Sequence, residues 1–303
     1  MSYKEEQKQH QINLLSNPLI FPSGTEGGGK YKGNEYPHIL KGKDVKRNLR
    51  ADIQEKVFAY FNNTIQWWGG SITGNLLSSQ IACLNHLFPI RCHEDIVLKI
   101  LQGIDSNFEK VLKIPNDNDL QYISFEVISM SNLLNESNRK RGANCTSVDA
   151  MIIAQKRDGN KYLILIEWKY TENDKSNKSN NDTRHKRYDN LINTFLSKND
   201  DTEALFYKEP YYELMRQTLL AELMVKNESK EWLGISDYIH LLVVPNGNSA
   251  YRGKDGKMEK IWSTCLKHKE NFKLIDPSDL FEPIKGNPKC KELIDYLEMR
   301  YWK

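Results

Sequence analysis

The sequence has few cysteines, little net charge and no long apolar run. Its five cysteines are an odd number without the spacing of a disulfide framework, which favours reduced thiols and a cytoplasmic location. The opening residues, MSYKEEQKQHQINLL, lack the apolar segment of a signal peptide. Because no apolar stretch approaches the roughly 18 residues that span a bilayer, we also expect no membrane partner.

The net charge of +3 over 303 residues excludes attraction to a polyanion through the whole molecule, so such binding would depend on local patches. Hydrophobic residues make up 39% and charged residues 27%, which is typical of a folded soluble protein. We predict a glycine-rich and basic N-terminal arm over residues 1–50 and a single α/β domain over residues 51–303. The core of this domain would span about residues 78–244, and a helical C-terminal part would span residues 255–303.

Hydrophobic periodicity changes along the chain from helical to extended and back. It predicts helices in LRADIQEKVFAYFN, LLSSQIACLNHLF (with Ser78 or Ser79 as N-cap) and HEDIVLKILQGI. Strands follow in QYISFEVIS, TSVDAMIIAQK and KYLILIEWKYT. The polar segment from Glu172 to Asn190 is predicted to be a mobile loop. It precedes a helix in EPYYELMRQTLLAELMVKN, a strand in DYIHLLVV and two helical patterns, MEKIWSTCLKHKENF and KCKELIDYLEMRYW. This order predicts an α/β core with a mixed sheet.

The stretch ILIEWKY begins as a buried strand but ends with an acid and a base. Side chains alternate along a strand, so Leu163, Leu165, Glu167 and Lys169 share one face. Both faces are apolar before Glu167, which is typical of a central strand covered on both sides. Burying an unpaired charge is costly, so Glu167 and Lys169 require partners or a cleft open to solvent.

The preceding strand carries one acid, Asp149, in otherwise apolar surroundings. The connection KRDGNK indicates a β-hairpin, and the length of its loop decides whether the acids meet. A two-residue loop would place them on opposite faces. A three-residue loop ending in a left-handed Gly159 pairs Lys156 with Asn160 and places Asp149 directly opposite Glu167. Glycine is preferred at the third position of such a loop, so we predict the three-residue loop and the register that places Asp149 opposite Glu167.

Two facing carboxylates with Cβ atoms roughly 5 Å apart repel each other unless a cation lies between them. Mg²⁺ suits such a pair, because it takes one or two carboxylates together with waters and phosphate oxygens; Mn²⁺ would substitute for it. Lys169, on the same face as Glu167, would orient or help to deprotonate an attacking water. The chemistry that fits is hydrolysis of a phosphodiester.

The spacing of these residues matches a known motif. Asp149, followed after seventeen residues by Glu167-Trp168-Lys169, resembles the PD-(D/E)xK nuclease superfamily, which has the restriction-endonuclease-like fold. The resemblance implies that Asp149 and Glu167 bind a divalent metal and that Lys169 assists the nucleophilic water. It also implies an α/β core with a central mixed β-sheet flanked by helices.

The resemblance extends beyond the motif, over about residues 78–244. The superfamily's core order of helix, three strands, helix and strand agrees with the predicted elements. Val148 stands where the superfamily's name has proline, a frequent replacement. The phrases LLSSQIACLNHLF, RGANCTSVDA and IEWKYTE are similar to those of uncharacterised prokaryotic members.

A further residue is expected at the site because the superfamily commonly has a fourth acid on its first helix or first strand. We expect Glu126, in ISFEVIS, to assist catalysis, with Glu136 and Gln80 as weaker alternatives. Basic and polar side chains upstream of Asp149, in the polar segment and on the following helix would contact nucleic acid. They are Arg139, Lys140, Arg141, Arg184, Arg187, Arg216 and Gln217.

We therefore expect a Mg²⁺-dependent deoxyribonuclease with DNA as its partner, first of all a restriction-type endonuclease. A DNA repair or recombination nuclease and a catalytically inactive nucleic-acid-binding protein of the same fold are the alternatives. Because many such nucleases cut both strands as dimers, a homodimer is compatible with this expectation.

Two other patterns point to different chemistry, but each is incomplete. GTEGGGK, residues 24–30, has the spacing of a P-loop, yet Tyr31 stands where Ser or Thr would reach Mg²⁺. Cys83, His86, Cys92 and His93 could suggest zinc, but their spacing matches no common zinc finger. A glycine-rich turn and a buried thiol near histidines explain these patterns better.

Overall fold

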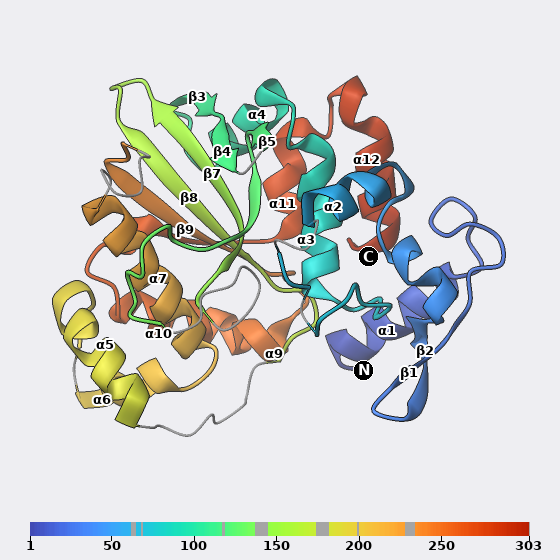
Figure 1. Cartoon of the computed structure of the whole chain (residues 1–303), viewed down its shortest axis with the longest axis horizontal. Helices are drawn as coiled ribbons and strands as arrows, with labels where there is room; N and C mark the ends of the chain where they lie inside the picture. The colour runs from blue at the N-terminus through green and yellow to red at the C-terminus, as the bar shows by residue number, and fades with distance from the viewer. Residues whose placement is uncertain are drawn as a thin grey trace.

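A mixed six-stranded β-sheet forms the centre of the protein (Figure 1). The computed structural model describes residues 1–61, 65–67, 69–116, 119–136, 145–173, 182–198, 200–227 and 234–302. The sheet has the order β10-β9-β8-β7-β3, and β6 also pairs with β7. Its strands are β3 (Phe108–Leu112), β6 (Ser124–Val127), β7 (Val148–Lys156), β8 (Lys161–Trp168), β9 (Asp237–Val243) and β10 (Phe272–Ile275). The predicted α/β fold with a central mixed sheet is confirmed.

The turn between β7 and β8 has the predicted three-residue form. Lys156 N donates a hydrogen bond to Asn160 O at 2.9 Å, so these two residues close the loop. Gly159 has a φ of +86°, in the left-handed region that favours glycine. The loop length is thus set locally by the position of this glycine.

The register of the hairpin follows from the turn. The ladder pairs Ala150 with Ile166 in an antiparallel arrangement. Continuing the same register by one residue places Asp149 opposite Glu167, as the three-residue loop predicted. A shift of one residue would move one of these acids to the other face of the sheet.

Helices cover both faces of the sheet (Figure 1). One core contains side chains from α3 (Ser79–Leu87), α4 (Glu94–Ile104), α11 (Pro277–Phe281) and α12 (Lys291–Arg300). The other contains side chains from α5 (Asp182–Phe195), α7 (Tyr211–Lys226) and α10 (Lys257–Thr264). Ile164 and Ile166 face the first core, whereas Leu163 and Leu165 face the second. Burial on both sides explains why β8 is apolar on both faces.

The N-terminal segment contributes to the first core. Leu14, Phe21 and Leu40 are buried in it, although the division of the chain at residue 50 stays a prediction. The GTEGGGK pattern lies across the start of β1, and a second strand rather than a helix follows it. The elements are α1 (Tyr3–Leu14), β1 (Gly27–Tyr31), β2 (Asn34–Leu40), the 3₁₀ helices η1 (Gly42–Asn48) and η2 (Ala51–Ile53), and α2 (Gln54–Phe61).

The remaining elements are short. They are β4 (Ile114–Asn116), β5 (Asp119–Gln121), α6 (Asp200–Glu203), α9 (Ser249–Arg252), η3 (Phe88–Ile90), η4 (Ala204–Tyr207), η5 (Lys254–Gly256), η6 (Lys269–Asn271), η7 (Glu282–Ile284) and η8 (Pro288–Cys290).

All five cysteines are free thiols. Of the helices in the described part of the chain, none combines the length and the apolar character needed to cross a lipid bilayer.

Two predictions of local structure were wrong. The predicted loop over residues 172–190 contains the first part of α5, because Tyr188 and Ile192, one turn apart, are buried in the second core; residues 174–181 lie outside the described residues. The helical pattern predicted to end at Phe272 stops at Thr264, and Phe272 begins β10. Parallel pairing with β9 stabilises this short edge strand, a contact that local periodicity does not reveal.

The turn generates a stability prediction. Gly159→Ala should lower the free energy of unfolding by about 1–2 kcal/mol, because a Cβ is unfavourable at positive φ. Gly286→Ala is a matched control, since a Cβ at either position meets no atom within 4 Å and only Gly159 has a positive φ. Urea unfolding of both variants tests this; equal midpoints would contradict the left-handed turn.

Candidate active site

Three predicted catalytic residues lie at one end of the β7–β8 hairpin. Asp149 is the second residue of β7, Glu167 is the last but one of β8, and Lys169 follows β8 directly. Glu167 and Lys169 are buried, whereas Asp149 is partly exposed. Asp149 Oδ2 accepts a hydrogen bond from Trp168 N at 2.7 Å, which holds this carboxylate against the end of β8. The antiparallel register therefore gathers all three side chains.

Lys169 lies between two carboxylates. Its Nζ donates to Glu167 Oε1 at 2.7 Å and lies 2.5 Å from Glu213 Oε2, on α7. Burial alone would lower the pKa of Lys169, but Glu167 and Glu213 outweigh burial and raise it well above its usual value. Lys169 is consequently a stable ammonium at neutral pH.

One ammonium does not neutralise both acids. Burial raises the pKa of Glu167 well above its usual value, and the neighbouring Asp149 and Glu213 carboxylates raise it further. Burial would also raise the pKa of Glu213, but the Lys169 ammonium outweighs it and lowers this pKa. Glu213 is thus the acid that Lys169 compensates better, whereas ionisation of Glu167 is disfavoured.

Asp149 shares a pocket with Glu126. The pocket is lined by Phe61, Gln80, Cys83, Leu84, Phe125, Glu126 and Asp149. Burial, followed by the negative charge of Glu126, raises the pKa of Asp149 to about 8. Glu126 is itself buried, has a φ of +50°, and accepts a hydrogen bond from Gln80 Nε2 at 2.6 Å. The structure therefore places both Glu126 and its alternative Gln80 beside Asp149.

Glu167 is held from the opposite side by a chain of buried polar groups. Gln217 Nε2 donates to Glu167 Oε2 at 2.6 Å and to Ser147 O at 3.2 Å. Gln217 Oε1 lies 3.2 Å from His240 Nε2, and His240 Nδ1 lies 3.0 Å from Thr218 Oγ1. Burial lowers the pKa of His240 to about 4, so its ring is neutral. Since Gln217 Oε1 only accepts, His240 donates from Nε2 and accepts from Thr218 at Nδ1.

Arg216 and Glu136 belong to a neighbouring network. Arg216 Nη1 donates to Thr146 Oγ1 at 3.2 Å and lies 3.9 Å from Glu136 Oε1. Glu136 also accepts from Thr146 N at 2.7 Å and from the Tyr188 hydroxyl at 2.9 Å. The carboxylate of Glu136 is therefore held by residues of this second network. Of the two alternatives to Glu126, Gln80 lines the pocket of Asp149 and Glu136 does not.

Of the basic residues predicted to contact nucleic acid, two lie on α5 and three lie outside the described residues. Arg184 stacks on the Tyr212 ring at 4.4 Å from its centroid, and Arg187 lies 5.8 Å from the Tyr188 centroid. Both belong to α5 rather than to a loop. Arg139, Lys140 and Arg141 lie outside the described residues.

The donor atoms at the hairpin end suit a hard cation. Asp149, Glu167 and Glu213 all interact with the Lys169 ammonium, and Glu126 lies beside Asp149, so acidic side chains outnumber basic ones at this end of the hairpin. Asp149 Oδ1 accepts no hydrogen bond from any described residue. In that same part of the chain no three Asp, Glu, His or Cys side chains converge as a metal cluster. A metal would rest on Asp149 and Glu167 with water completing its shell, an arrangement that fits Mg²⁺.

A model of one protein family matches residues 20–302, nearly the whole chain; its description is Restriction Endonuclease associating with ARP, abbreviated REase-ARP. The chain belongs to this family. No curated protein and no solved structure gave a match. The membership supports a restriction-endonuclease-like protein with a nuclease-type function, and a restriction endonuclease acts on DNA.

Sequence reasoning missed two residues at this REase-ARP site. Glu213 lies one helical turn before Gln217, and this i to i+4 spacing places both on one face of α7. His240 is the only histidine in the apolar strand DYIHLLVV. The spacing could have indicated Glu213, whereas the contact of His240 with Gln217 depends on the packing of α7 against β9.

The zinc alternative gains no support from His86. Its Nδ1 lies 2.7 Å from Ala82 O, and its Nε2 accepts from Trp302 Nε1 at 3.0 Å. Both ring nitrogens are therefore engaged within the protein. Cys83 is buried, as expected for an inert thiol.

The raised pKa of Asp149 generates a pH prediction. Between about pH 4 and pH 8 the folded state holds a proton that the unfolded state lacks, so stability falls as pH rises. Asp149→Asn cannot ionise and should gain at least about 1 kcal/mol relative to wild type between pH 5 and pH 8. Urea unfolding in EDTA measures this difference. Asp158→Asn, at the other end of the hairpin, should show the same pH dependence of the free energy of unfolding as wild type. If Asp149→Asn also shows that pH dependence, the pKa of Asp149 is not raised.

Proposed function

We propose that this protein is a divalent-metal-dependent nuclease of the PD-(D/E)xK type that hydrolyses DNA phosphodiester bonds as a restriction-type endonuclease. The observation that carries the proposal is the hairpin register, which sets Asp149 opposite Glu167 with Lys169 beside them. Membership of a restriction endonuclease family supports the same chemistry independently.

Asp149 and Glu167 would hold Mg²⁺ or Mn²⁺. A bound ion of this kind lowers the pKa of water and polarises a phosphoryl oxygen. The protein contributes orientation: Trp168 N fixes one oxygen of Asp149, and Gln217, held by His240, fixes one oxygen of Glu167. The carboxylates are thereby aligned before any ligand arrives, which reduces the reorganisation that the reaction requires.

Lys169 acts as a hydrogen-bond donor in this proposal. Its raised pKa keeps it protonated, so it would orient the attacking water or stabilise negative charge on the phosphate, and would not remove a proton. Glu126 assists through its charge beside Asp149.

Two other functions remain as alternatives: a repair or recombination nuclease, and an inactive nucleic-acid-binding protein. The family membership favours the restriction-type enzyme over the first. The intact set of Asp149, Glu167 and Lys169 favours activity over the second.

Cleavage assays test the proposal. Wild type should cut supercoiled plasmid or a mixture of long genomic duplexes, which offers many sequences, with Mg²⁺ or Mn²⁺ and not with EDTA. Asp149→Asn, Glu167→Gln and Lys169→Met should each lose about 100-fold or more in rate, because each removes a group at the reacting phosphate. Asp158→Asn, on the same hairpin but distant from the site, should cut like wild type.

Three outcomes separate the alternatives. Undiminished cleavage by all three site variants would reject the assigned residues. Duplex binding by wild type without cleavage would indicate the inactive binding protein. Degradation from free ends, with closed circles left intact, would indicate an exonuclease of the repair type.

Metal removal gives a second test. Saturating Mg²⁺ should raise the melting temperature of wild type, because a ligand at about 100 times its Kd stabilises the folded state by about 2.7 kcal/mol. Asp149→Asn should lose this shift, whereas Asp158→Asn should retain it. Equal shifts in all three proteins would place the bound ion elsewhere.

A further inference from the structure

The hairpin of β1 and β2 presents an unusual tip. Tyr31 pairs with Asn34 around the turn residues Lys32 and Gly33, which both have positive φ. Tyr31 is 52% exposed and is among only four large hydrophobic side chains that are exposed in the described ranges. Lys30 precedes it and forms a long, exposed ion pair with Glu35 at 3.8 Å, so the tip carries an exposed aromatic ring between two lysines and keeps a net positive charge.

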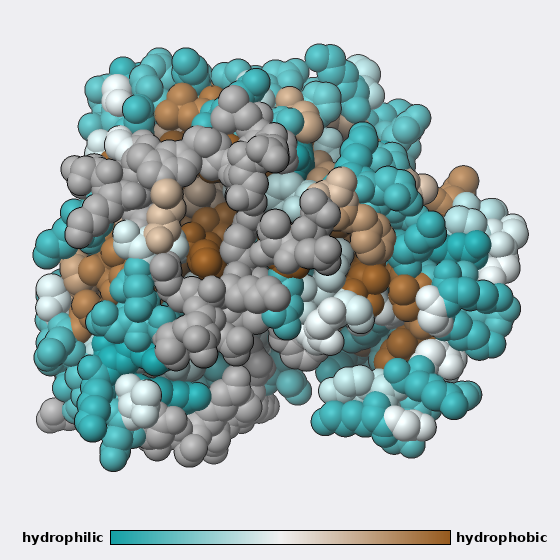
Figure 2. All heavy atoms as spheres, in the orientation of Figure 1, coloured by the Kyte–Doolittle hydropathy of each residue, from teal (hydrophilic) through white to brown (hydrophobic). Residues whose placement is uncertain are grey.

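The positive charge of the protein is concentrated around this hairpin. Residues 24–50 contain seven basic and three acidic residues, a net charge of +4, whereas the whole chain carries +3. The rest of the chain is therefore slightly acidic. In the space-filling view the lower right of the molecule, where the hairpin lies in Figure 1, is mostly hydrophilic or neutral (Figure 2).

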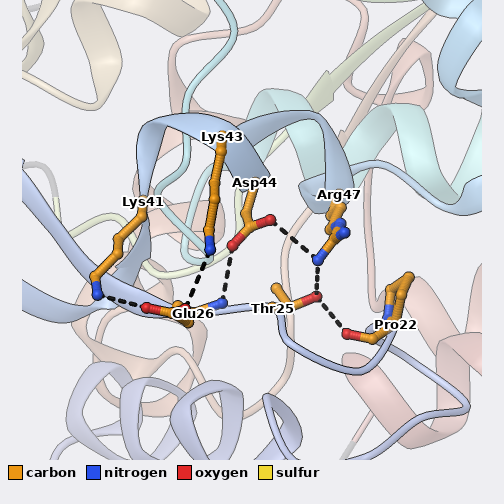
Figure 3. Close-up of polar contacts among 7 residues, drawn as sticks. All are labelled: Pro22, Thr25, Glu26, Lys41, Lys43, Asp44 and Arg47. Atoms are coloured by element: carbon orange, nitrogen blue, oxygen red, sulfur yellow. Dashed lines mark hydrogen bonds and ion pairs between the residues drawn. The ribbon is translucent and has the colours of Figure 1, made fainter.

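A polar network fastens the base of the hairpin to η1 (Figure 3). Asp44, which is buried, accepts from Glu26 N at 3.0 Å and pairs with Arg47 at 3.0 Å. Lys41 and Lys43 both pair with Glu26, at 2.5 and 3.1 Å. Two lysines on one exposed carboxylate leave a surplus of positive charge. Exposed ion pairs contribute at most about 1 kcal/mol to folding stability, so they are easily exchanged. Phosphate oxygens can therefore compete for these lysines.

The glycine run has a structural role at this base. A Cβ on Gly27 would lie 2.1 Å from Pro37 O, and one on Gly29 would lie 2.3 Å from Leu40 O. Neither backbone oxygen can move easily, so the two strands approach this closely only with glycine. The close approach and the network together give the tip a defined direction.

The hairpin base contacts the segment that leads into α3. Leu76 N donates to His38 O at 3.0 Å, and Asn75 forms a bridge with Ile39 of β2. The chain then enters α3, where Gln80 contacts Glu126. Figure 1 shows the hairpin beside α1 on the side of the molecule where α3 begins.

We propose that the β1–β2 hairpin is a DNA-contacting element of this nuclease. Lys30 and Lys32 neutralise phosphates of the bound duplex, and the Tyr31 ring packs against sugars or bases at a groove. A two-stranded ribbon fits the major groove of B-DNA, and an aromatic flanked by cations suits a nucleic acid. This inference rests on the proposed function, because it takes duplex DNA as the substrate. The family match, which begins at residue 20, includes the hairpin.

Binding measurements test the hairpin separately from catalysis. The full-length Asp149→Asn protein, with Mg²⁺, is titrated onto a fluorescent duplex at several salt concentrations. Adding Lys30→Ala and Lys32→Ala together should weaken binding and reduce the slope of log K against log salt by about 1.8, since each phosphate contributes about 0.9. Tyr31→Ala should weaken binding about tenfold at an unchanged slope. Lys289→Ala with Lys291→Ala, at exposed lysines near the start of α12, should change neither quantity.

The outcomes distinguish this inference from the proposed function. If wild type cleaves DNA and the hairpin variants bind with unchanged affinity and slope, the hairpin is not a DNA contact, and the nuclease proposal is unaffected. A weaker affinity of the lysine variant at an unchanged slope would overturn the assignment of its lysines to phosphates. Failure of the parent to bind any duplex at low salt, together with no cleavage by wild type, would overturn both. The hairpin and control positions are exposed, so the urea midpoints of these variants should match that of their Asp149→Asn parent.

Discussion

The pairing of β7 with β8 decides which charged groups of this protein meet. Side chains alternate along each strand, so a displacement by one residue would separate Asp149 from Glu167 across the sheet. The three-residue loop with Gly159 in the left-handed region prevents that displacement. The surrounding arrangement builds on this register: Trp168 N reaches Asp149, Lys169 reaches Glu167, and α7 adds Glu213 and Gln217.

The site also shows how buried charge is tolerated. Lys169 offsets part of the acidic charge, while the hydrogen bonds from Gln217 and Trp168 N satisfy carboxylate oxygens without neutralising them. The cost of ionising the remaining acids is visible in the raised pKa of Asp149 and Glu167. A protein gains little stability from such a cluster, and the proposed binding of a cation would explain why the carboxylates are not replaced by amides. His240 serves this arrangement indirectly, because a neutral ring keeps the Gln217 amide in one orientation.

The N-terminal segment links this site to a distant surface. Tyr170, which follows Lys169, donates to Gln7 at 2.8 Å and accepts from Gln11 at 3.1 Å, so α1 is fastened to the end of β8. The hairpin of β1 and β2 is attached through the segment that precedes α3. Residues that compositional analysis separates as an arm thus contact the end of β8 that carries the candidate site.

The sequence by itself determined the hairpin, its register and the meeting of Asp149, Glu167 and Lys169, because a glycine at a fixed loop position and strict alternation are local properties. It also indicated the buried strands and most helices, including α3 with Ser78 as its N-cap. Only the tertiary structure decided that α5 replaces part of a polar loop, that β10 joins β9, and that Glu213 and His240 complete the site. Those outcomes depend on contacts between segments that are distant in the chain: His240 meets Gln217 only because α7 packs on β9. Periodicity reports which face of an element is buried, but not which side chain of another element it will meet.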